Sequence, residues 1–145
     1  MRLGHESDTD LLVAAILHDT VEDTETTPEE IESTFGRVVR DIVMEVTDDK
    51  NLAKEERKRL QIVKAHLKSR PARKLKLADK ICNVYDIIHH APYGWTIERR
   101  LAYLQWCEQV LEGLRGVNFL LEKKLAQSIA EGRSLLLASE NQNVA

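Results

Sequence analysis

Residues 11–23 of the chain read LLVAAILHDTVED, seven apolar residues followed directly by a run that is mostly polar and acidic. The apolar part offers no polar face, and a helix that is apolar on every side is buried among other helices. Residues 7–10 (Ser-Asp-Thr-Asp) precede it and supply side chains that cap a helix start. The stretch therefore predicts a buried helix that ends in a cluster of titratable side chains.

Capping and periodicity signals predict further helices along the chain. Residues 27–30 (Thr-Pro-Glu-Glu) are a capped helix start with proline at its first position. Apolar residues at spacings i, i+3, i+4 and i+7 then form one stripe over residues 39–46. Further helices are expected over residues 53–68, 69–90, 96–116 and 118–137, with a frayed polar tail at residues 139–145. Since no segment alternates like a strand, we expect an all-α fold, a bundle of about six helices.

The composition is that of one compact soluble domain. The chain has 145 residues, 43% of them hydrophobic and 31% charged, which suits one core and leaves too little chain for two. No apolar run approaches the roughly 20 residues of a membrane span, and the first residues lack the apolar stretch of a secretory signal. Cys82 and Cys107 match neither a disulfide framework nor a Cys-x-x-Cys metal site. We therefore expect a cytoplasmic protein that does not bind membranes.

Positive charge is concentrated in the middle of the chain. Residues 54–76 hold ten Lys or Arg and two Glu, a balance of +8 in a chain whose net charge is -3. Such a stripe either faces an anion or forms a solvated helix face, and both interpretations stay open. Nucleic-acid binding is not expected, because no aromatic residue lies between these basic residues to stack on bases.

The candidate chemistry begins at His18 and Asp19. On a continuous helical path, His18 would lie one turn from Glu22, and Asp19 one turn from Asp23. Crowded carboxylates raise one another's pKa unless a cation lies between them. One imidazole nitrogen and hard carboxylate oxygens suit Mn²⁺, Fe²⁺ or Zn²⁺. A His-Asp pair at a helix end can equally be a cap and an ion pair, so the pair needs a distant partner.

Asp79 is the natural distant partner, because it is a carboxylate within the apolar segment 75–81. A buried carboxylate needs a compensating group. The alternative is a surface ion pair between Asp79 and Lys76 or Lys80. Asn83, one turn further on, extends the same polar face and would hydrogen-bond either a sugar or phosphate or a neighbouring helix.

Several segments resemble the RelA/SpoT branch of the HD-domain metallohydrolases, and above all its small, hydrolase-only members of the metazoan SpoT-homologue type. The matching segments are HDTVEDT (18–24), FG (35–36), EVTDDK (45–50), ERKRLQ (56–61), KLADKICN (76–83) and APYGW (91–95), with Arg99 and Tyr103. They cover nearly the whole chain.

The resemblance implies an HD-domain bundle and a hydrolase that removes the 3′-pyrophosphate from guanosine tetraphosphate (ppGpp) and pentaphosphate (pppGpp), with one Mn²⁺ ion as cofactor. It implies metal ligands at His18, Asp19 and Asp79, a pair that positions and activates water at Glu22 and Asp23, and substrate-binding positions at Lys54, Asn83, Arg99 and Tyr103. We expect Lys54 and Arg99 to meet phosphates, and most of the other basic residues between 57 and 76 to solvate a helix face.

The chain departs from the family pattern at its beginning. The family has another metal-binding histidine on an upstream helix, and the only upstream histidine here, His5, does not match it. We therefore expect residues 1–138 to form an HD-type metallohydrolase domain that lacks the family's N-terminal helices, followed by the tail at 139–145. Two alternatives remain open: an HD phosphatase for another nucleotide such as NADPH, and a catalytically impaired domain with a regulatory or interaction role.

Overall fold

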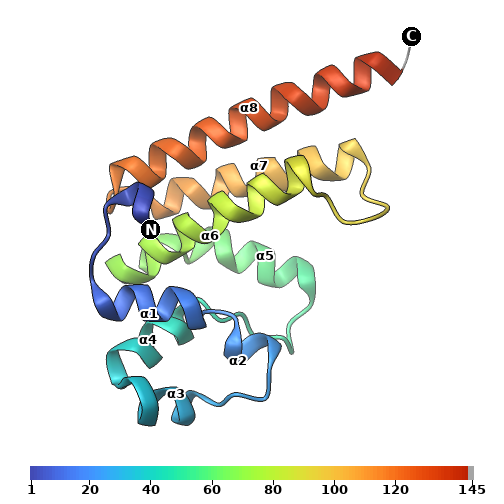
Figure 1. Cartoon of the computed structure of the whole chain (residues 1–145). Helices are drawn as coiled ribbons and strands as arrows, with labels where there is room; N and C mark the ends of the chain where they lie inside the picture. Colours follow the sequence, from blue (N-terminus) through green and yellow to red (C-terminus); the bar gives the residue numbers. More distant parts are fainter. Residues whose placement is uncertain (144–145) are drawn as a thin grey trace.

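The computed structural model describes residues 1–143, and these residues form helices without any β-strand. Seven α-helices have eight or more residues and α2 is a single turn, so the all-α prediction is confirmed. In chain order the elements are η1 (Arg2–Gly4), α1 (Thr9–Leu17), α2 (Thr20–Asp23), α3 (Pro28–Phe35), α4 (Arg37–Glu45), α5 (Lys54–Val63), η2 (Ala65–Leu67), α6 (Arg70–His89), α7 (Ile97–Leu114) and α8 (Phe119–Asn143) (Figure 1).

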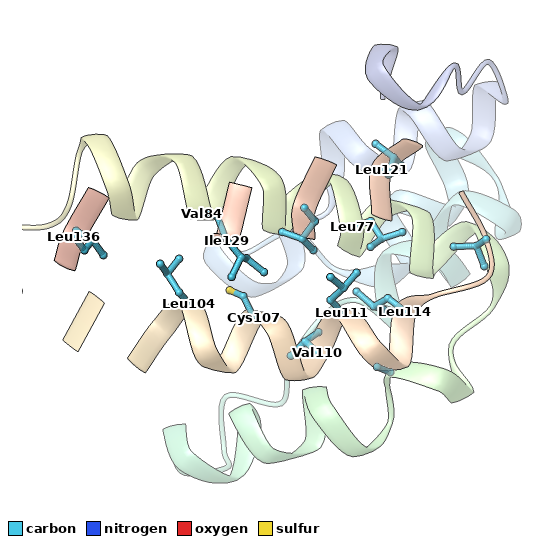
Figure 2. Close-up of a cluster of buried hydrophobic side chains, with 13 residues drawn as sticks. Leu77, Val84, Leu104, Cys107, Val110, Leu111, Leu114, Leu121, Ile129 and Leu136 are labelled. Atoms are coloured by element: carbon cyan, nitrogen blue, oxygen red, sulfur yellow. The ribbon is translucent and has the colours of Figure 1, made fainter. Parts of the chain in front are cut away.

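Two clusters of buried apolar side chains hold the helices together, and α6 belongs to both. The first lies where α1, α3 and α4 meet the start of α6, and it includes Leu11 and Leu75. The second lies between α6, α7 and α8 and includes Leu77 and Leu111 (Figure 2). Because Leu75 and Leu77 belong to different clusters, the part of α6 directly before Asp79 is fixed from two sides.

Local capping explains where several helices begin. The predicted capping box of α3 is present: Thr27 Oγ1 accepts a hydrogen bond from the Glu30 N–H (3.2 Å), and the Glu30 carboxylate accepts one from the Thr27 N–H (2.8 Å). These two bonds satisfy N–H groups that the helix itself leaves without partners. Four further helices begin with a side-chain cap, which comes from Asp8 in α1, Ser69 in α6, Thr96 in α7 and Asn118 in α8.

The expectation that α1 is buried on every side is wrong. Leu11 and Ala14 are buried, but Ile16 on another face of the helix is 80% exposed. The packing partners of α1 are α4 and α6, which cover one side only. Among residues 1–143, none of the helices combines the length and apolar character that crossing a membrane requires.

Two other helix boundaries differ from expectation. The basic helix expected over 53–68 is divided into α5 and the short η2. Gly113 lies in the last turn of α7, where a Cβ would come within 2.5 Å of Ala65 Cβ on η2, so this close approach requires glycine. Gly116, with φ +95°, follows the end of α7. The residues expected as a frayed tail continue α8 as far as Asn143, and residues 144–145 lie outside the described part.

Candidate active site

The helix is interrupted where the candidate ligands begin. α1 ends at Leu17, residues 18 and 19 form a turn, and the single turn α2 follows. The Thr20 hydroxyl donates to the Leu17 carbonyl oxygen (2.7 Å), which stabilises this break. The continuous helical path that we assumed through residues 18–23 is therefore wrong, and contacts within this segment follow from the turn.

The His18 ring is held by its own helix. Nδ1 lies 2.7 Å from the Ala15 carbonyl oxygen, and since a carbonyl can only accept, Nδ1 carries the proton. In the neutral ring, Nε2 then holds the lone pair. This Nε2 is buried without a hydrogen-bond partner of good geometry, although carboxylate oxygens of Asp19 (3.1 Å) and Asp79 (3.3 Å) lie beside it. A ligating histidine typically has this arrangement, with its second nitrogen fixed by a backbone carbonyl.

The electrostatics of this cluster favour a positive charge between the side chains. The Asp79 carboxylate raises the pKa of His18 to about 9, against the opposing effect of burial. Burial acts to raise the pKa of Asp79, but His18 and the ammonium of Lys76 outweigh it and hold the pKa well below its usual range. Lys76 Nζ is 3.3 Å from Asp79 Oδ2, so the ion pair that we considered as an alternative exists together with the histidine contact.

The donor set fits a divalent ion. Cis ligands with bonds of about 2.1 Å are separated by roughly 3 Å, close to the 3.1 and 3.3 Å that separate His18 Nε2 from the two carboxylates. As they stand, no three or more His, Cys, Asp or Glu side chains among residues 1–143 form a complete ion-holding group. The Asp19 side chain is 63% exposed and has room to turn. His18 and the two carboxylates are thus suitable ligands that are not arranged as a closed site.

The two carboxylates of α2 have different surroundings. Burial, and then the charge of Asp48, raises the pKa of Glu22 above its usual value. Asp23 Oδ1 lies 3.3 Å from Lys50 Nζ, and both side chains are more than half exposed. Glu22 is therefore the better proton acceptor near neutral pH, whereas Asp23 is tied to a lysine at the surface.

A cavity of about 290 Å³ lies between α5 and α7 and holds three of the four predicted substrate residues. Its lining residues are Asp48, Lys54, Arg57, Lys58, Gln61, Trp95, Arg99, Ala102, Tyr103 and Trp106. Among residues 1–143, the four cations of this lining have no carboxylate within ion-pair distance. A cavity with four unpaired cations and one acid favours a ligand that carries several negative charges.

Aromatic rings in this cavity lie against cations. The Arg99 guanidinium is 3.9 Å from the centre of the Trp95 ring, and the buried Lys80 ammonium is 4.0 Å from that of Trp106. Trp106 Nε1 also donates to the Lys58 carbonyl oxygen (3.1 Å), which joins α7 to α5. The contact between Trp106 and Lys80 could not be predicted from the sequence, because only the packing of α5, α6 and α7 brings the two residues together.

Asn83 connects the metal-ligand candidates to a second cavity, which adjoins the first. Its Nδ2 donates to Asp79 Oδ2 (3.3 Å), and Asn83 also lines a second, open cavity of about 590 Å³. Trp95 and Tyr103 line both cavities. Burial raises the pKa of Tyr103, so its hydroxyl stays protonated. The structure therefore brings all four predicted substrate residues to one pair of adjoining cavities.

Arg57 does not behave as expected. We assigned it to a solvated helix face, but it is half-buried and lines the cavity of about 290 Å³ beside Lys54 and Lys58. The helical spacing of residues in α5 does not show that Arg57 faces a cavity, because the cavity forms only where α7 packs beside α5.

Comparison with known proteins agrees with these observations. Residues 2–92 match the HD-domain family. The chain is similar to the guanosine-3′,5′-bis(diphosphate) 3′-pyrophosphohydrolase MESH1 of Xenopus tropicalis, at 55% identity over 126 residues (85% of this chain, 70% of the relative). The human MESH1 protein is 51% identical over 126 residues, which are again 85% of this chain and 70% of the relative. A solved structure described as a metazoan orthologue of SpoT that hydrolyses ppGpp has 47% identity and a TM-score of 0.84, over 88% of this chain and 71% of that one.

The fold and the His-Asp cluster are thus those of an HD-domain protein. The chain belongs to the HD-domain family, and within it to the group formed by the MESH1 proteins. The resemblance to the RelA/SpoT branch is confirmed. Membership in this hydrolase family implies a divalent metal ion.

Proposed function

We propose that this chain hydrolyses guanosine tetraphosphate and pentaphosphate, releasing the 3′-pyrophosphate, and that its metal ion is Mn²⁺. The observation that supports this most directly is that Asn83, which contacts Asp79 of the His18 cluster, lines a cavity that shares Trp95 and Tyr103 with the cavity of unpaired cations. About half of the residues are identical to those of proteins named for this activity. The absence of a disulfide between Cys82 and Cys107 agrees with the cytoplasmic location that we also propose.

The metal would be held by His18 Nε2 and the carboxylates of Asp19 and Asp79. A bound divalent ion supplies a water molecule of lowered pKa and screens the charge of the phosphates. The Ala15 carbonyl keeps the His18 ring in the tautomer that leaves Nε2 free. The Asn83 amide fixes the orientation of the Asp79 carboxylate, since Nδ2 donates to Oδ2.

Glu22 takes the proton of the attacking water at its carboxylate. Its pKa is raised by burial and by Asp48, which brings its basicity closer to neutral pH. Asp23 helps to hold α2 in place through its ion pair with Lys50.

The substrate is held by the cavity between α5 and α7. Lys54 and Arg99 bind phosphate oxygens. The negative charge of the phosphates compensates these two cations, which have no carboxylate partner among the described residues. The Trp95 ring keeps the Arg99 guanidinium in place through its face, at 3.9 Å. Tyr103 forms a wall shared by both cavities and excludes water from that side.

The experiment is a product assay on the purified chain with Mn²⁺. Incubation with guanosine tetraphosphate should release pyrophosphate and GDP, and Asp79→Asn should abolish the release. NADPH is tested in parallel, and faster phosphate release from NADPH than pyrophosphate release from guanosine tetraphosphate would favour the other nucleotide. If neither substrate is turned over above the Asp79→Asn background, the impaired domain is the correct interpretation.

A further inference from the structure

Arg57 separates two cavities. It lines the cavity of about 290 Å³ between α5 and α7 and also a neighbouring cavity of about 330 Å³ that lies against the segment joining α4 to α5. Asp48 and Gln61 are the other residues common to both. Gln61 lies one helical turn after Arg57, so the two side chains share one face of α5. Arg57 therefore stands in the wall between the cavities.

The Arg57 side chain presents a buried donor without an acceptor. Its Nε is buried and makes no hydrogen bond with any of residues 1–143. Arg59, two residues further along α5, provides a direct contrast, because its Nε and Nη2 donate to the Glu56 carboxylate at 2.9 and 2.6 Å. A buried donor that stays unpaired costs free energy, so this position favours a ligand that brings an acceptor.

The acid that lines both cavities together with Arg57 does not take up this donor. Asp48 Oδ2 accepts a hydrogen bond from Gln61 Nε2 (2.6 Å), and no Asp48 oxygen lies within ion-pair distance of Arg57 among the described residues. Lys54 and Lys58, which flank Arg57 in the sequence, add positive charge to the same cavity. Gln61 Oε1, one turn along α5, is also buried without a partner within residues 1–143, but it is a neutral acceptor. A phosphate oxygen carries charge and suits a guanidinium N–H particularly well.

On the basis of the nucleotide substrate proposed above, we propose that Arg57 is a further substrate-binding residue whose guanidinium donates to a phosphate oxygen of the bound nucleotide. The phosphate belongs either to the 5′ chain or to the 3′-pyrophosphate. Both have the same chemistry, and the choice of probes distinguishes them.

The test is a calorimetric titration of the chain with three probes: GDP, GTP and inorganic pyrophosphate. Arg57→Gln should weaken binding of at least one probe by roughly tenfold or more, the size expected for loss of a charged hydrogen bond. Arg59→Gln is the matched control, since it removes the same group from an exposed position of the same helix, and it should change affinity less than twofold. Arg57→Lys keeps the positive charge but loses the planar guanidinium with its several N–H donors. Its affinity should therefore lie between those of the parent and Arg57→Gln.

The outcomes separate cleanly. Weaker binding of GDP and GTP assigns Arg57 to the 5′ chain, and weaker binding of pyrophosphate alone assigns it to the leaving group. Equal losses in Arg57→Gln and Arg59→Gln would show general attraction by positive charge and overturn the proposal. So would unchanged affinity with a lowered Tm in Arg57→Gln, because Arg57 would then serve an internal contact, such as one with Gln61 Oε1. If the parent fails to hydrolyse guanosine tetraphosphate while Arg57→Gln still loses affinity, the proposed function fails and the role of Arg57 stands.

Discussion

His18 Nε2 lies 3.3 Å from Asp79 Oδ1, which joins the turn after α1 to the middle of α6. The two helices pack against each other, and Leu11 and Leu75 are buried in the same apolar cluster. The contact therefore depends on the hydrophobic packing of that cluster, which brings the His18 ring nitrogen and a carboxylate to one point.

Loss of Asp79 should remove the metal. Asp79→Asn replaces a charged oxygen donor by a neutral amide, so Mn²⁺ affinity should fall by about tenfold or more. The measurement is metal content after dialysis against limiting Mn²⁺. Asp86→Asn, at an exposed position on the same helix, serves as the control and should retain the metal of the parent. Equal Mn²⁺ in parent and Asp79→Asn would remove Asp79 from the ligand set.

Glu22→Gln should separate metal binding from turnover. The amide cannot accept the proton of the attacking water, so kcat should fall by roughly 100-fold or more while Mn²⁺ content stays the same. Steady-state kinetics on guanosine tetraphosphate measure this. Glu25→Gln, exposed and two residues beyond α2, is the matched control. Full turnover by Glu22→Gln would exclude it as the base.

Without metal, stability should fall as pH rises from 6 to 8. The contact with Asp79 raises the pKa of His18 from 6.5 to about 9, so the folded state holds a proton that the unfolded state releases. The stabilisation is complete below pH 6.5 and is lost as pH rises through about 9. Urea midpoints with a chelator present measure the trend, and His18→Gln should flatten it. An equal slope in parent and His18→Gln would contradict this origin.

Lys80→Met should stabilise the folded chain at pH 7. Lys80 is 3% exposed, and burial lowers its pKa to about 8, which means that its charge is costly in the folded state. Methionine keeps most of the volume and loses the cation–π contact with Trp106 and the attraction to Asp79, which together are smaller than the cost of burying the charge, so we expect a gain of about 1 kcal/mol in unfolding free energy. Urea denaturation gives the value. A decrease would mean that the cation–π contact outweighs the cost of burying the charge.

Gly113→Ala should destabilise the junction of α7 and η2. The new Cβ would come within 2.5 Å of Ala65 Cβ, and a buried clash of this kind costs about 1 to 3 kcal/mol. Thermal denaturation should show a lowered Tm. Glu112→Ala, at the preceding exposed position, should change Tm much less. If Gly113→Ala melts like the parent, the helices can separate without cost.

Local sequence signals determined most of the helices. The start of α3 could be predicted because Thr27 and Glu30 complete their hydrogen bonds within a single turn, independently of the rest of the chain. The break in the helix at His18 could not be predicted. Apolar periodicity carries no information about a turn that is stabilised by contacts between side chains and backbone. The ligand candidates came from residue types and from family resemblance, and their roles remain predictions.

By itself, the sequence determined an all-α fold and the positions of most helix starts, and it predicted candidate residues for holding a metal ion and phosphates. Only the tertiary structure decided that α1 is buried on one face, that Arg57 faces a cavity, and that Trp106 lies against Lys80. Helix starts depend on hydrogen bonds between residues a few positions apart. The direction in which a helix face points depends on how distant helices pack, and that is set by the fit of many apolar side chains at once.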